Sequence, residues 1–139
     1  MLPADIDRLD VLIVDDNRDG AVGMANLLQL HGYTTAVATD ARSARKFFAR
    51  DPLAALVDYR MFTVYGDEVI RELVVACPGC KAALITAATD VDTAGIAKAA
   101  GAVHSFEKTG KIDPALDFLW GYGIEPSRSP QLTTRLGGQ

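Results

Sequence analysis

The most regular feature of this chain is an alternation between short apolar runs and longer amphipathic segments. Each apolar run is rich in β-branched or small hydrophobic residues and is bounded by polar or turn-forming residues, a pattern that predicts a buried strand. The predicted strands are residues 11–14, 34–38, 54–57, 82–85 and 102–106.

The segments between and after these runs place apolar residues at helical spacing. Asn17 is predicted to cap the first helix and Asp113, followed by Pro114, the last one. Gly32 is predicted to adopt the left-handed conformation that ends the first helix. The predicted helices are residues 18–31, 41–50, 67–76, 92–100 and 113–122.

A strand followed by a helix, five times over, is typical of an α/β protein with helices on both faces of a parallel sheet. The predicted fold class is a flavodoxin-like (βα)5 doubly wound sheet with strand order 2-1-3-4-5, in which strands one and three are neighbours. The predicted domain spans residues 9–122. Residues 123–139 are rich in Pro, Ser, Thr and Gly, which predicts a tail or linker.

Composition narrows the function classes. The hydrophobic fraction of 49% is typical of a globular domain. The net charge of −4, with Lys and Arg scattered, argues against a nucleic-acid-binding surface. No apolar stretch approaches the roughly 20 residues that a membrane span needs. Because no signal peptide is visible either, we expect a cytoplasmic protein with no membrane partner.

The two cysteines, Cys77 and Cys80, form a Cys-Pro-Gly-Cys sequence. Such spacing serves redox chemistry when a helix N-terminus follows and lowers a thiol pKa, but an apparent strand follows here. Half of a zinc site is another interpretation, although His31 and His104 stand alone in the sequence. The pattern favours a turn with incidental cysteines and leaves a redox role open.

Polar residues follow four of the five predicted strands. They are Asp15 and Asp16 after the first strand, Asp58 after the third, Thr86 after the fourth and Lys108 after the fifth. Parallel strands bring their carboxyl ends to one edge of the sheet, so we expect these side chains to converge there. Three carboxylates in one crevice repel one another unless a cation intervenes, and Mg²⁺ is the natural cation for oxygen ligands.

The same set of residues fits phosphoryl transfer. Asp58 would be the nucleophile that forms an aspartyl phosphate. Lys108 would supply positive charge to the phosphoryl oxygens, and the Thr86 hydroxyl would donate to another oxygen. Taken singly, each residue is better explained without chemistry, the aspartates as helix caps or turn residues, Thr86 as a strand residue and Lys108 as a solvated loop residue; their joint occurrence indicates chemistry.

Over about residues 9–122 the chain resembles the receiver domain of two-component response regulators. The motifs that carry the resemblance are Val14-Asp15-Asp16-Asn17, Val57-Asp58-Tyr59-Arg60-Met61 with Gly66, Ile85-Thr86-Ala87, and Gly101-Ala102 leading to Lys108. The resemblance implies that Asp58 accepts a phosphoryl group from a sensor histidine kinase or phosphotransfer protein. It implies that Asp16, Asp58 and the Arg60 carbonyl bind Mg²⁺ directly, with Asp15 helping through water.

Three positions depart from the family pattern. Phe62 and Thr109 stand where the family often has proline, and Ser105 stands where it has a switch aromatic residue. Strand alternation should point Phe106 and His104 to the face opposite Ser105, so neither ring replaces the missing one. The usual relay from the threonine to an inward-turning ring is therefore expected to be absent or altered.

The leading hypothesis is a phosphorylation-controlled switch rather than a metabolic enzyme, either acting alone or as part of a longer protein. Its output partner, or a second copy in a homodimer, would contact the predicted helix 92–100, the strand 102–106 and the last helix, where Trp120 and Tyr122 lie. The alternative is a pseudo-receiver that binds proteins without being phosphorylated.

An aspartate-nucleophile hydrolase is disfavoured because Arg60 stands where a second acid is needed. A nucleotide-binding domain is disfavoured because no glycine-rich loop follows the first strand.

Two further residues bear on how long the phosphorylated form would last. In the alignment of motifs, Arg60 and Ala88 flank the phosphoryl group. Ala88 has no polar group to guide an attacking water, and Arg60 would cover the site. We therefore expect slow self-dephosphorylation, which the half-life of the phosphoprotein without a phosphatase would measure.

Overall fold

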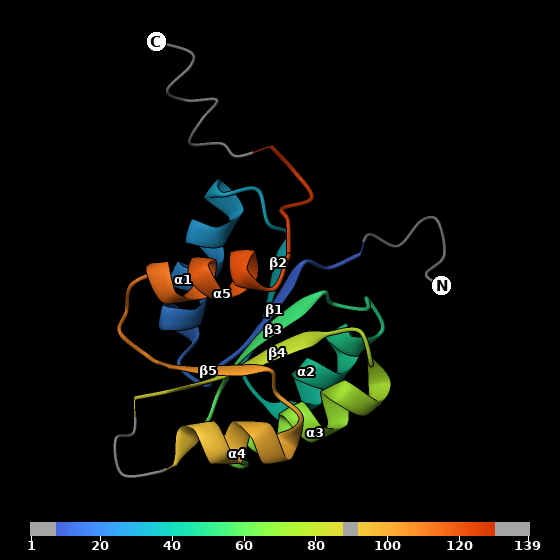
Figure 1. The fold of residues 1–139 in the computed structure, drawn as a ribbon, viewed down its shortest axis with the longest axis vertical. Helices are drawn as coiled ribbons and strands as arrows, with labels where there is room; N and C mark the ends of the chain where they lie inside the picture. The colour runs from blue at the N-terminus through green and yellow to red at the C-terminus, as the bar shows by residue number, and fades with distance from the viewer. Residues whose placement is uncertain (1–7, 88–91, 130–139) are drawn as a thin grey trace.

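A five-stranded parallel sheet forms the centre of the molecule (Figure 1). The structure is a computed structural model and describes residues 8–87 and 92–129. The strand order β2-β1-β3-β4-β5 confirms the predicted topology. The strands are β1 Val11–Val14, β2 Thr35–Ala38, β3 Ala54–Asp58, β4 Lys81–Thr86 and β5 His104–Glu107.

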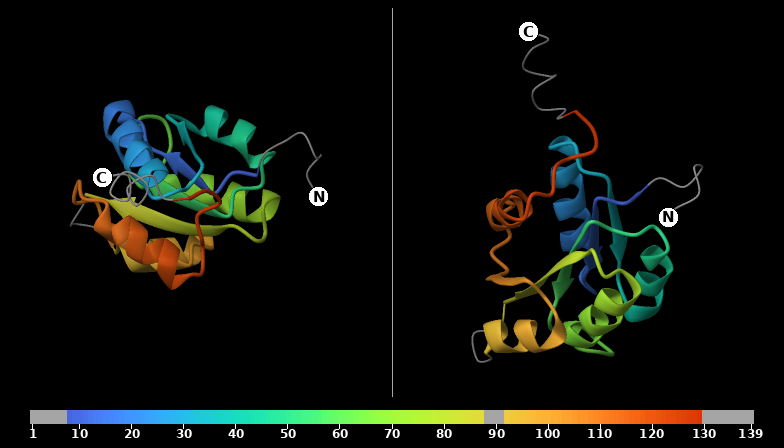
Figure 2. Two further views of the ribbon diagram at one scale, coloured as in Figure 1. Left: turned by 90° about the horizontal axis from the view of Figure 1, so that it is seen from above. Right: turned by 45° about the vertical axis from the view of Figure 1, so that its right-hand side comes forward.

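Five helices cover the two faces of the sheet, and Figure 2 shows this layering from two further directions. Helices α2, α3 and α4 pack on one face, and α1 and α5 pack on the other. None of the helices in the described part of the chain has the length and apolar character needed to cross a bilayer. The helices are α1 Arg18–Leu30, α2 Ala41–Phe48, α3 Gly66–Ala76, α4 Thr93–Ala100 and α5 Asp113–Gly121.

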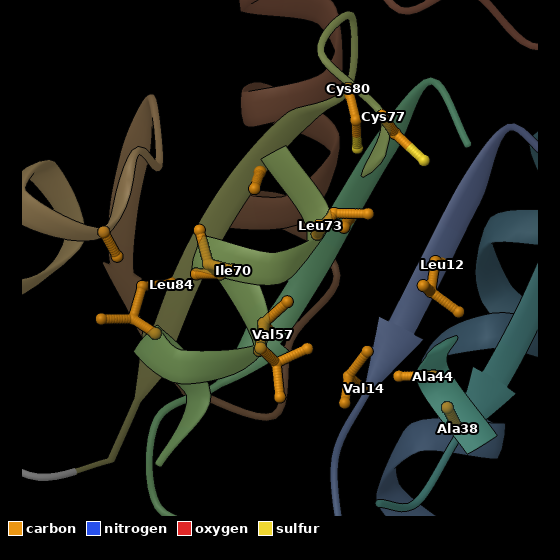
Figure 3. Packing of buried hydrophobic residues seen from close by; sticks show 14 of the residues in the cluster. Leu12, Val14, Ala38, Ala44, Val57, Ile70, Leu73, Cys77, Cys80 and Leu84 are labelled. Carbon is orange, nitrogen blue, oxygen red and sulfur yellow. The ribbon is translucent and has the colours of Figure 1, made fainter. Parts of the chain in front are cut away.

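The central strands are apolar throughout because both of their faces are covered. In β1, Leu12 and Val14 point into the core beneath α2, α3 and α4, whereas Val11 and Ile13 point into the core beneath α1 and α5. Figure 3 shows the first of these cores, in which Val57 of β3 lies between the β1 residues and Leu84 of β4. The sheet is thus rigidly held at the strand ends that carry the candidate site.

Most predicted bounds agree with the structure to within one residue; the start of β5 and the end of α2 differ by two residues, and the cap of the last helix also differs. Strand β5 begins at His104, later than predicted, because the Ala102 N–H donates to the Ala97 carbonyl at 2.9 Å and so closes the end of α4. Gly101, at φ 98°, makes that closure possible. The predicted cap Asp113 lies inside the first turn of α5, with Ile112 at the cap position. An acid in the first turn still favours the helix through its dipole.

The other two cap predictions are confirmed. The Asn17 side chain accepts a hydrogen bond from the Gly20 N–H at 3.3 Å, which caps α1. Gly32 follows that helix with φ 94°, in the left-handed region that only glycine adopts freely. The Asn17 cap fixes where α1 begins, directly after the two aspartates that follow β1.

Both cysteine side chains are buried between α3 and β4 (Figure 3). The Cys77 thiol donates to the Phe48 carbonyl at 3.3 Å, and burial raises the pKa of Cys77. Burial also raises the pKa of Cys80 to about 12. Because redox and metal chemistry use the thiolate, these raised pKa values favour the interpretation of a turn with structural cysteines.

The chain after α5 folds back onto the start of the sheet. Ile124 is buried, and its carbonyl accepts a hydrogen bond from the Tyr33 hydroxyl at 2.8 Å. Ser127 donates to the buried Asp10 carboxylate through its N–H at 3.1 Å and its hydroxyl at 2.7 Å. The predicted boundary between residues 122 and 123 remains a prediction, but the segment 124–128 contacts the domain.

Replacing Ser127 by alanine is expected to lower the free energy of unfolding by about 1–2 kcal/mol, because a buried carboxylate loses a hydrogen-bond donor. Urea denaturation of the whole chain measures the change. Ser129→Ala is the matched control, since Ser129 makes no contact of this kind with Asp10. Equal stability of the two variants would show that the Ser127 hydroxyl does not stabilise the domain.

Candidate functional site

The three aspartates predicted to converge do so at the carboxyl ends of β1 and β3. Asp15 and Asp16 follow β1 directly, and Asp58 is the last residue of β3, the parallel neighbour of β1. One carboxylate oxygen from each residue lies within 4.8 Å of the other two. Asp15 and Asp58 are buried and Asp16 is half-buried, so the cluster opens toward solvent on the Asp16 side.

Lys108 reaches this cluster from the end of β5. Its Nζ lies 2.6 Å from Asp15 Oδ2 and 4.0 Å from Asp58 Oδ2. Its backbone N–H donates to the carbonyl of Thr86 at 2.9 Å, which fixes the lysine beside the last residue of β4. Thr86 is buried. The ends of β1, β3 and β5 therefore bring the three aspartates and Lys108 together, and Thr86 at the end of β4 is joined to Lys108 through its backbone.

The electrostatics of the cluster centre on Asp58, whose pKa is raised to about 7. Burial is the largest cause, and the negative charge of Asp15 is the next; Lys108 acts in the opposite direction. Ionising Asp58 is therefore costly even with the Lys108 ammonium group nearby. A divalent cation would relieve this cost, and three carboxylates around a partly open crevice are a donor set that suits Mg²⁺.

The loop from β3 to α3 carries Arg60, two residues after Asp58. Tyr59 donates its N–H to the Ile85 carbonyl at 2.8 Å and accepts from the Gly66 N–H at 2.7 Å. Arg60 pairs with Tyr65 in an isolated antiparallel bridge. Gly66 approaches so closely that a Cβ atom there would lie 2.1 Å from the Asp58 carbonyl oxygen. Glycine at this position lets the start of α3 lie against the end of β3.

A cavity of about 410 Å³ lies beside the cluster, between α1 and the loop that follows β5. Asp58 and Lys108 line it, together with apolar side chains such as Met24 and Phe106 and polar ones such as Glu107 and Lys111. The sequence pattern does not reveal this cavity, because it depends on the spacing of α1 from the loop. The cavity leaves the Asp58 carboxylate accessible although its strand is buried.

The structure gives the exposure and contacts of Phe62 and Ser105, two of the positions that depart from the family pattern, and of the rings beside Ser105 in β5. Phe62 is 96% exposed. His104 stacks on Phe118 of α5 at 5.7 Å between ring centroids, and Phe106 packs in the core beneath α1 and α5. Ser105 faces the opposite way and lines a surface pocket beside α4. The predicted facing of these three β5 residues is confirmed.

Ala88 lies outside the described residues, so slow self-dephosphorylation remains a prediction.

A family model described as the response regulator receiver domain matches residues 11–117. The chain belongs to this family. A response regulator receiver protein of Anaeromyxobacter sp. (strain Fw109-5) is 34% identical over 107 residues, which are 76% of this chain. These residues correspond to 45% of that protein, so the chain matches less than half of its relative's length.

Solved structures of receiver domains share the fold. A CheY-like receiver domain protein from Methanospirillum hungatei JF-1 has a TM-score of 0.74 at 20% identity, covering 83% of this chain and 93% of its own. The receiver domain of NtrX from Brucella abortus has a TM-score of 0.73 at 27% identity and coverages of 85% and 100%. TrrA from Thermotoga maritima, solved in complex with Mg²⁺ and BeF, has a TM-score of 0.71 at 24% identity and coverages of 81% and 97%.

Proposed function

We propose that this receiver domain is a phosphorylation-controlled switch in which Asp58 accepts a phosphoryl group from a sensor histidine kinase or a phosphotransfer protein. The observation that carries the proposal is the meeting of Asp15, Asp16 and Asp58 with Lys108 at one edge of the sheet. Clustered carboxylates repel one another and destabilise the fold, so a structural role does not explain them. A role in binding a cation and a phosphoryl group does.

In this proposal Asp16, Asp58 and the Arg60 carbonyl would hold Mg²⁺, with Asp15 contributing through water. The ion would supply positive charge to the phosphoryl oxygens during transfer. A carboxylate oxygen of Asp58 attacks phosphorus, and the bond from phosphorus to the donor nitrogen breaks. Lys108 needs to move little to meet the new oxygens, because its Nζ already lies 4.0 Å from Asp58 Oδ2.

Output would leave through the surface of α4, β5 and α5, toward an output domain or a second copy of the chain. Two apolar side chains there are exposed: Tyr122 by 39% and Val103 by 38%. Trp120, 59% exposed, lies on another side of α5, beside Tyr33. Ser105 lies beside α4 and carries no ring. His104 stacks on Phe118, so β5 contacts α5 through aromatic rings. We propose that α5 receives the signal in place of a switch ring.

The test is to incubate the whole chain with Mg²⁺ and acetyl phosphate and to measure the intact mass. We expect a gain of one phosphoryl group that Asp58→Asn abolishes and that EDTA prevents. Beryllofluoride, a phosphoryl mimic, should change the fluorescence of Trp120, the one tryptophan of the chain, in the wild type only. Absence of an Asp58-dependent adduct would contradict the proposal and favour the pseudo-receiver.

A further inference from the structure

Two tyrosine rings stack across the loop between β3 and α3. Tyr59 directly follows Asp58, and Tyr65 directly precedes Gly66. Their ring centroids lie 5.0 Å apart with an interplanar angle of 20°. Tyr59 is half-buried against the core beneath α2, α3 and α4, whereas Tyr65 is 50% exposed. The stack therefore ties the end of the loop to its beginning.

The backbone of the loop is closed at the same place. The Gly66 N–H donates to the Tyr59 carbonyl at 2.7 Å, and Arg60 pairs with Tyr65 across the loop. The Tyr59 N–H is in turn bonded to the Ile85 carbonyl of β4. Arg60 is thus held between its anchored neighbour Tyr59 and its bridge partner Tyr65, two residues after Asp58.

Tyrosine is an unfavourable residue at the N-cap position of a helix, where Tyr65 lies. It occupies the N-cap position of α3, with φ −88° and ψ 148°, and its side chain makes no capping hydrogen bond. Serine, threonine, aspartate or asparagine would accept a backbone N–H there and stabilise the helix. A half-exposed tyrosine gives up that stabilisation, so its ring contact with Tyr59 offers the better account of the residue.

We infer that the Tyr59–Tyr65 stack is a positioning pair for the metal site, which holds Arg60 where its carbonyl can serve as a ligand. The inference rests on the proposed function, in which that carbonyl binds Mg²⁺. Neither ring touches the ion; the pair orders the loop before binding. Without the stack, Mg²⁺ has to order the loop as it binds, and part of its affinity is lost.

The test is calorimetric titration of Mg²⁺ into the whole chain, which reads binding independently of phosphorylation. Tyr65→Ser removes the ring but supplies a capping hydroxyl, so α3 is expected to be at least as stable as before. We expect this variant to bind Mg²⁺ about fivefold more weakly, the middle of the range for one aromatic pair. Tyr59→Leu keeps a buried apolar side chain without the stack and should weaken binding similarly.

Two controls keep the test specific. Tyr65→Phe retains the stacked ring and should bind Mg²⁺ as the wild type does. Phe62→Ala removes the 96% exposed ring of the same loop, which takes no part in the stack, and should also leave the affinity unchanged. Urea denaturation of each variant separates a loss of Mg²⁺ affinity from a loss of fold.

The outcomes separate this inference from the proposed function. If the wild type binds Mg²⁺ and forms the Asp58 adduct while Tyr65→Ser binds equally well, the inference alone is overturned. A loss in Phe62→Ala as large as in Tyr65→Ser would overturn it too, since the whole loop rather than the stack would then govern binding. If the wild type binds no Mg²⁺, the metal site fails, and the positioning role fails with it.

Discussion

Replacing Asp58 by asparagine is expected to stabilise the metal-free protein by about 3 kcal/mol at about pH 8 and hardly at all at about pH 4. The pKa of Asp58 is raised to about 7 in the folded protein, chiefly by burial and then by Asp15. In the unfolded chain this carboxyl ionises near its ordinary value of about 4. The folded state therefore holds more protons between these two values, and its stability falls as the pH rises from about 4 to about 7.

Urea denaturation in EDTA across this range measures the effect. The wild type should lose stability as the pH rises, and Asp58→Asn should lose much less, because asparagine does not ionise. Asp117→Asn, which removes an exposed acid from α5, is the matched control and should follow the wild type. Saturating Mg²⁺ should narrow the difference by stabilising the wild type. Parallel pH profiles for Asp58→Asn and the wild type would contradict the prediction.

Replacing Gly66 by alanine is expected to destabilise the protein by about 2–3 kcal/mol, as overpacking against a buried backbone does. The new Cβ would lie 2.1 Å from the carbonyl oxygen of Asp58 and 2.8 Å from its carbonyl carbon. These are backbone atoms of the site-bearing strand, so either α3 or the end of β3 has to move. We therefore expect weaker Mg²⁺ binding together with the loss of stability.

The sign of this result is informative, because Gly66 is the first residue of α3 and alanine is the better helix former. Helix propensity alone predicts a more stable variant. Gly23→Ala is the matched control: it lies within α1 with no atom near the added Cβ, and should gain up to about 1 kcal/mol. A Gly66→Ala variant as stable as the Gly23→Ala variant would show that the close approach to Asp58 is not a constraint.

The sequence was sufficient for features that depend on local pattern. Apolar runs gave β1 at its observed bounds, Val11–Val14, and alternation gave the opposed facing of Ser105 and His104. The convergence of the site followed from topology, because the ends of parallel strands meet at one edge. The strand order alone therefore predicted that Asp15 lies close to Asp58.

Features that depend on long-range contacts could not be predicted from pattern. The pairing of Lys108 with Asp15 rather than Asp58 depends on distances of 2.6 and 4.0 Å across the sheet. Ser127, in a segment whose composition is typical of a linker, bonds to a carboxylate 117 residues earlier in the chain. The Tyr59–Tyr65 stack joins residues whose spacing matches no regular element.

The two buried thiols have a practical consequence for labelling the protein. Cys77 and Cys80 are buried, and both have raised pKa values, so the folded protein should react slowly with maleimides and other alkylating reagents. A single cysteine introduced on the surface could then be labelled selectively without removing the native pair. A spin or fluorescent label placed at the exposed position 62 would report on the loop between β3 and α3, and one at the exposed position 120 would report on α5.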